Sequence, residues 1–171
     1  MTIVILARHG ETDWNRAGRW QGWADPPLNE LGREQAAELA ERLRDTPFDA
    51  VYTSDLRRAH ETAVIVAEPH GVPVVTDPGL REIDVGSWSG LTRQEIDEQF
   101  GGERTDGETR EQHTARVRAA AARLVAAHPD ERILLVSHGG TIRALAESYA
   151  GSLENCAVIE LRWVDDRLVP A

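Results

Sequence analysis

Lysine is absent from this chain, and cysteine and methionine occur once each. All 19 basic residues are arginines, which excludes Schiff-base catalysis, a Walker lysine and a serine–lysine pair. The single cysteine, Cys156, excludes an internal disulfide bond and makes the reducing cytoplasm the expected location. Long apolar runs are also missing: no window approaches the ~20 apolar residues of a membrane span, and the N-terminal run is too short for a signal peptide.

The bulk properties are those of an ordinary soluble protein. The 171 residues contain 41% hydrophobic and 28% charged residues, with no linker or repeat, so we expect one domain over residues 1–171. The net charge of −10 argues against a nucleic acid or an anionic membrane as partner. It does not exclude a small anionic substrate, because a local group of arginines can lie inside an acidic surface.

The apolar periodicity predicts an alternation of strands and helices. Such alternation favours an α/β sheet covered by helices. Helix 30–44 has Asn29 as its expected N-cap, and Ser54 or Asp55 is the expected cap of the next helix. The helix that Ser54 or Asp55 caps is expected to end near residue 68, and three more helices are expected over 92–99, 111–127 and 141–150. The expected strands are 3–7, 49–53, 72–76, 133–136, 158–164 and 167–169.

Conspicuous polar residues follow three of these strands. They are Arg8-His9-Gly10, the segment 53–59 with Arg57 and Arg58, and Ser137-His138-Gly139-Gly140. If the strands are parallel, these ends meet at one edge of the sheet, where ligands of such sheets bind. Arginine forks and helix N-termini suit phosphate oxygens, so this edge is predicted to bind a phosphoryl group.

The choice of nucleophile follows from the motifs that are missing. There is no P-loop, no Gly-x-Ser-x-Gly elbow and no cysteine in a phosphate-binding loop. A histidine that accepts the phosphoryl group on a ring nitrogen remains. The leaving alkoxide needs a proton, for which we select Glu82, with Asp84 and Glu11 as the competing acids.

Arg8-His9-Gly10-Glu11-Thr12-Asp13-Trp14-Asn15 resembles the signature of the histidine phosphatase superfamily, the phosphoglycerate mutase-like proteins. Four further blocks resemble this family in the same order, and together they make the likeness specific. These blocks are Gln21-Gly22 with 25–32, Ser54–Ala63, Leu80–Gly90 and Val136–Gly140.

The resemblance implies a role for each matching residue. His9 would form a phosphohistidine, Glu82 would be the proton donor, and Arg8, Arg58 and His138 would hold the phosphoryl group. Asn15, Gln21, Gly22 and Gly139 would complete the substrate pocket. The resemblance implies no metal or other cofactor, and a three-layer α/β/α sandwich whose mostly parallel sheet has one antiparallel strand.

The chain departs from the family pattern in two places. Gly107-Glu108-Thr109 stands where Gly-Glu-Ser is common, and the segment Phe100–Asp106 is short. The mutases of this family have longer insertions and a C-terminal tail, which this chain lacks. A short segment leaves the site open to water, so we expect a phosphatase acting on a small phosphorylated metabolite. A phosphoglycerate mutase is the main alternative, followed by a metallohydrolase, a phosphoprotein phosphatase and a non-catalytic phospholigand-binding protein.

The remaining candidates have plainer interpretations. Trp14, Trp20 and Trp23 are expected to pack the 10–28 loop, although one could stack on the substrate, and Cys156 is expected in the core. Arg57 is expected to face solvent or Glu61, with a smaller chance that it replaces Arg58 at the phosphate. Four other histidines are expected to be solvated, namely His60, His70, His113 and His128.

Overall fold

Strand β1 (Ile3–Arg8) lies inside the sheet of this computed structural model, which describes residues 1–147, 149 and 151–170. β1 pairs in parallel with β4 (Arg132–Ser137) and antiparallel with β5 (Val158–Val164). The strand order over the described residues is β3-β2-β4-β1-β5-β6, and β5 runs against the other strands. The mostly parallel sheet with one antiparallel strand is therefore confirmed. β2 (Ala50–Thr53) lies between β4 and β3, and the edge strands are β3 (Val74–Thr76) and β6 (Arg167–Pro170).

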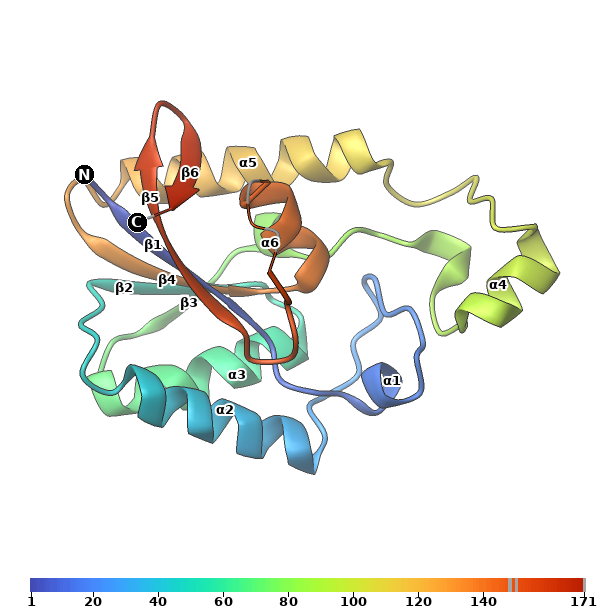
Figure 1. The fold of residues 1–171 in the computed structure, drawn as a ribbon, viewed down its shortest axis with the longest axis horizontal. Helices are drawn as coiled ribbons and strands as arrows, with labels where there is room; N and C mark the ends of the chain where they lie inside the picture. Colours follow the sequence, from blue (N-terminus) through green and yellow to red (C-terminus); the bar gives the residue numbers. More distant parts are fainter. Residues whose placement is uncertain (148, 150, 171) are drawn as a thin grey trace.

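Helices cover both faces of the sheet (Figure 1). α2 (Glu30–Leu43) and α3 (Arg57–Ala67) lie against one face, and α5 (Arg110–Ala126) and α6 (Gly139–Leu145) lie against the other. Alternate side chains of the central strands enter two cores, so that Leu134 packs with α2 and α3 whereas Leu135 packs with α5 and α6. The continuous apolar run at 133–136 reflects this burial on both faces, and the three-layer sandwich is confirmed.

The start of α2 follows its sequence signal, but the start of α3 does not. Asn29 caps α2 by accepting a hydrogen bond from the Gly32 N–H (2.8 Å). The prediction for α3 is wrong, because this helix begins at Arg57 and neither Ser54 nor Asp55 is its cap. The carboxylate of Asp25, from the loop before α2, accepts from the Arg57 N–H instead (2.6 Å). A cap supplied from 32 residues away leaves no local signal.

Other boundaries differ from the predicted ones. The segment 10–28 contains a short helix, α1 (Asp13–Arg16), which Thr12 caps, and α4 (Arg93–Phe100) begins after Thr92. α6 begins two residues earlier than predicted, at Gly139, and ends at Leu145 instead of Ala150. Ser148 and Ala150, within the predicted helix, lie outside the described residues. None of the described helices is long and apolar enough to span a membrane.

The carboxyl ends of β1, β2 and β4 point to the same edge of the sheet, as predicted. The loops that carry α1 and α4 lie beyond this edge, on the right in Figure 1. Gly10 brings the first of these loops against the start of α2, since a Cβ atom at Gly10 would lie 2.3 Å from the Gly32 carbonyl oxygen. This contact places the residues after β1 above the sheet edge.

Candidate active site

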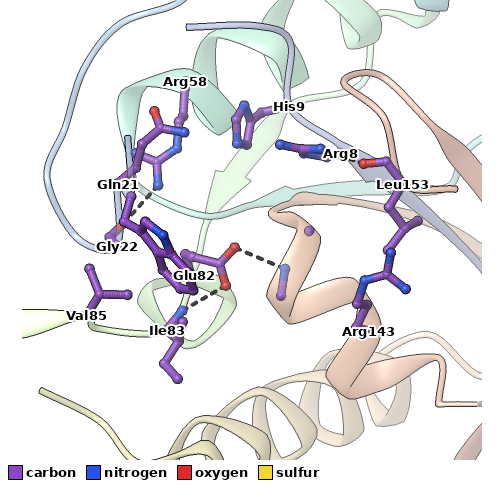
Figure 2. Close-up of a pocket in the computed structure, with 13 residues that line it drawn as sticks. Arg8, His9, Gln21, Gly22, Arg58, Glu82, Ile83, Val85, Arg143 and Leu153 are labelled. Carbon is purple, nitrogen blue, oxygen red and sulfur yellow. Dashed lines mark hydrogen bonds between the residues drawn. The ribbon is translucent and has the colours of Figure 1, made fainter. Parts of the chain in front are cut away.

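A pocket of about 300 Å³ lies at this edge of the sheet (Figure 2). The end of β1 contributes Arg8 and His9, the first turn of α3 contributes Arg58, and the loop after β3 contributes Glu82. The wall also contains three more of the predicted residues and six that were not predicted. The predicted ones are Gln21, Gly22 and Gly139, and the others are Trp20, Ile83, Val85, Gly140, Arg143 and Leu153.

His9 is held as a neutral imidazole with one ring nitrogen open. Its Nδ1 lies 2.6 Å from the Gly10 carbonyl oxygen, which can only accept, so Nδ1 carries the hydrogen. Burial and the neighbouring charges of Arg58 and Arg8 hold the pKa of His9 well below its ordinary value of 6.5. Nε2 therefore keeps its lone pair, which is the state that a nucleophile requires.

Two arginines and a second histidine surround His9. The ring centroid of His138 lies 5.2 Å from that of His9, and His138 is fully buried behind the pocket wall. Arg8 donates to the Leu153 carbonyl (2.5 Å), and Arg58 donates to the carbonyls of Gly22 and Ala24 (2.8 Å each). Burial lowers the pKa of Arg58 to about 10, so the guanidinium is still charged at neutral pH.

Several buried donors in this group have no protein acceptor. Within the described part of the chain, Arg8 Nε, Arg58 Nε and both ring nitrogens of His138 lack a hydrogen-bond partner. Buried polar groups are ordinarily hydrogen-bonded, and each unpaired one costs about 1–3 kcal/mol. Because burial holds the pKa of His138 well below its ordinary value, its ring is neutral and donates through one nitrogen. Among the described residues of this group, the unpaired N–H donors are therefore three, one each on Arg8, Arg58 and His138, and they suit the oxygen atoms of an anionic ligand.

Glu82 faces this group from the opposite side of the pocket, next to α6 (Figure 2). Its Oε1 accepts from the Ile83 N–H (2.9 Å) and its Oε2 from the Gly140 N–H (3.0 Å). The competing acids are engaged elsewhere. Asp84 accepts from the Gly86 N–H, Glu11 pairs with Arg16, and neither lines the pocket.

The predicted substrate-binding residues divide into two kinds. Gln21 and Gly22 lie in the wall, where Gln21 Oε1 accepts from the Thr12 hydroxyl (2.7 Å). Asn15 does not line the pocket, because its side chain completes the cap of α1. Asn155 donates to Asn15 Oδ1 (3.4 Å) and to the His9 carbonyl (3.0 Å), so this pair supports the backbone of His9.

Two residues of this region were missed or misjudged. Arg143 lies in the pocket wall, four residues after Gly139 on α6, and that helical spacing is a signal that could have identified it. The expectation that His113 is solvated is wrong: its side chain is 4% exposed, and its Nε2 lies 3.9 Å from Glu82 Oε1. Its i, i+4 relation to buried Val117 on α5 was the available signal.

The other expectations have mixed outcomes. Arg57 is exposed, as expected, but Glu61 pairs with Arg33 (2.6 Å) instead. Trp23 packs its loop and donates to the Glu82 carbonyl (2.8 Å), whereas Trp20 lines the pocket. Cys156 is in the core, as expected. No group of three His, Cys, Asp or Glu that could hold a metal occurs in residues 1–147, 149 and 151–170.

Comparison with known families gives a match over almost the whole chain. Residues 4–168 match the model of the histidine phosphatase superfamily (branch 1). The described fold and the predicted motifs agree with this match.

The relatives include proteins named as phosphatases and proteins named as probable phosphoglycerate mutases. The metal-independent phosphoserine phosphatase of Arabidopsis thaliana is 38% identical in an alignment of 192 positions. The alignment spans 97% of this chain and 80% of the relative. Glucosyl-3-phosphoglycerate phosphatase of Mycobacterium tuberculosis is 40% identical over 162 residues, which cover 84% of this chain and 73% of the relative. The solved structure of Bacillus stearothermophilus YhfR has a TM-score of 0.92 and 31% identity, covering 100% of this chain and 96% of the other.

Proposed function

Because this chain belongs to the histidine phosphatase superfamily (branch 1), we propose that it is a metal-independent phosphomonoester hydrolase with a phosphohistidine intermediate on His9. In this proposal residues 1–171 act as one domain. The observation that carries the proposal is the group of unpartnered buried donors on Arg8, Arg58 and His138 beside the open Nε2 of His9. This arrangement suits a phosphoryl group at the point of transfer.

The first step transfers the phosphoryl group to the enzyme. Nε2 of His9 forms a bond to phosphorus while the bond from phosphorus to the leaving oxygen breaks. Arg8, Arg58 and His138 bind the phosphoryl oxygens and stabilise their charge. Glu82 gives its proton to the leaving oxygen, which departs as an alcohol.

The second step returns the enzyme to its starting state. A water molecule attacks phosphorus and gives a proton to the Glu82 carboxylate, and the bond between phosphorus and His9 breaks. The products are inorganic phosphate, neutral His9 and protonated Glu82. The segment 100–106 does not line the pocket, so nothing from it excludes water, and this favours hydrolysis over the mutase reaction.

The leaving group occupies a second cavity of about 390 Å³ in this proposal. It adjoins the first pocket and shares with it Trp20, Ile83, Gly140 and Arg143. The shared wall combines apolar side chains with one guanidinium, which fits a small organic group that carries a negative charge. The relatives named for phosphoserine and glucosyl-3-phosphoglycerate have such substrates, so we infer a phosphorylated carboxylic acid acted on in the cytoplasm.

Labelling tests the intermediate. Enzyme quenched during turnover of a ³²P-labelled phosphomonoester should carry acid-labile, alkali-stable label, and the His9→Gln variant should carry none and have no activity. Activity should survive EDTA, because the neighbouring arginines repel a divalent cation. Full turnover by His9→Gln would refute the proposal. Stimulation by a bisphosphate with little release of inorganic phosphate would indicate the mutase instead.

A further inference from the structure

His113 lies beside the proposed acid but has no part in the two steps above. It comes from α5, its side chain is 4% exposed, and it lines the leaving-group cavity. Its Nε2 lies 3.9 Å from Oε1 of Glu82, whose side chain is 18% exposed. At 3.9 Å the two groups are beyond hydrogen-bond distance, so a proton passes between them through one water molecule in the cavity or after a small rotation of the Glu82 side chain.

The hydrogen bonds around His113 allow two protonation states. The Thr141 hydroxyl donates to the Arg81 carbonyl (2.9 Å), which can only accept, so the Thr141 oxygen is available to accept from His113 Nε2–H (3.1 Å). If Nε2 loses its hydrogen, the same hydroxyl can turn and donate to it. The contact between His113 and Thr141 therefore persists in both states.

The charges around His113 leave Glu82 as its effective partner. Burial and Arg116 lower the pKa of His113, while Glu82 and Glu108 oppose this shift. Glu108, however, is paired with Arg116 (2.7 Å), so much of its charge is already balanced. The buried imidazole of His138 also lies near His113. Three further charged residues line the leaving-group cavity with His113, namely Arg110, Arg143 and Glu147.

We propose that His113 is a positioning residue that shares one proton with Glu82, so that the pair supplies the proton that Glu82 gives to the leaving group. The inference rests on the proposed function. The bound phosphate dianion draws a proton to the pair. Before the ester bond breaks, this one proton lies on His113 Nε2 or on Glu82. As the bond breaks, the proton reaches the leaving oxygen through Glu82, which leaves Glu82 as a carboxylate and His113 neutral with its hydrogen on Nδ1. The proton later taken from water restores the pair.

The pair should hold a proton at higher pH than a carboxyl group alone. The Glu82 carboxylate opposes the lowering of the His113 pKa by burial, and two interacting groups take up protons as a unit. The alkaline limb of kcat/KM should therefore depend on His113. This dependence should appear only with substrates whose leaving oxygen requires a proton.

The His113→Val variant tests this, because it removes the imidazole and keeps an apolar side chain in the core. With an alkyl phosphate such as phosphoserine, we expect kcat/KM at neutral pH to fall about tenfold and the alkaline limb to move about one pH unit lower. With para-nitrophenyl phosphate, whose leaving group needs no proton, kcat/KM should stay within about twofold. The His113→Gln variant keeps an N–H donor but cannot carry the proton, so it should behave like His113→Val. His60→Gln, at an exposed position on α3, is the matched control.

The outcomes separate proton sharing from a structural role. An equal loss on both esters with an unchanged alkaline limb overturns the inference, as does recovery of that limb by His113→Gln. If the unchanged enzyme hydrolyses neither ester, or retains activity without His9, the proposed function itself fails and the inference fails with it.

Discussion

Gly140 is the position where one added carbon atom should disable the proposed acid. A Cβ atom built there lies 2.3 Å from Glu82 Oε1 and 3.0 Å from its Cδ. Non-bonded carbon and oxygen atoms rest above ~3.3 Å, so the carboxyl group must retreat by about 1 Å. Its hydrogen bond from the Gly140 N–H (3.0 Å) is then also lost.

The expected cost to catalysis is large, while the cost to folding is small. A displacement of about 1 Å can reduce a rate about 100-fold, which corresponds to ~2.7 kcal/mol in the activation free energy. Gly140 is the second residue of α6 and has no positive φ, so an alanine there adopts the same helical backbone without strain. Gly140→Ala should therefore stay folded and lose activity.

The assay compares kcat/KM of Gly140→Ala on an alkyl phosphate and on para-nitrophenyl phosphate, with Tm as the measure of folding. The loss should concentrate on the alkyl ester, because its leaving oxygen requires the proton. Gly139→Ala is the neighbouring comparison: its Cβ atom would lie 3.7 Å from Arg8 Nε, an ordinary contact, so it should lose less activity. A folded Gly140→Ala enzyme with unreduced kcat/KM on the alkyl ester would refute the placement of the acid.

Arg143→Met should raise KM for phosphorylated carboxylic acids but leave KM nearly unchanged for para-nitrophenyl phosphate, whose leaving group carries no carboxylate. Equal effects on both would contradict an anion-binding role of Arg143 in the leaving-group cavity. The free energy of unfolding should decrease as the pH is lowered below ~6.5. The reason is that the pKa values of His9 and His138 are lowered in the folded protein, so the unfolded chain binds more protons there. The slope should approach ~1.4 kcal/mol per pH unit for each histidine, and urea denaturation at pH 7.5 and pH 5.5 should show a larger unfolding free energy at the higher pH.

Periodic and local signals predicted most of the fold. The apolar run before Arg8 and the run at 133–136 predicted buried strands, and Asn29 predicted the start of α2, because each signal lies within a few residues of the feature it specifies. Signals fail where a distant residue completes the local structure. The Asp25 carboxylate, which caps α3 from 32 residues away, is one case. The apolar pattern also missed the end of α6, which ends at Leu145 and not at Ala150.

The sequence by itself determined the chemical inventory of this protein: no lysine, one cysteine, and Arg8, His9, Arg58, Glu82 and His138 in ordered motifs. Those residue types restrict the chemistry wherever the chain places them. Only the tertiary structure decided which atoms meet. It turned Nδ1 of His9 to the Gly10 carbonyl, removed Asn15 from the pocket wall, and brought His113 from α5 to within 3.9 Å of Glu82. The approach of His113 to Glu82 depends on how α5 packs against the loop after β3, and no local sequence pattern encodes that packing.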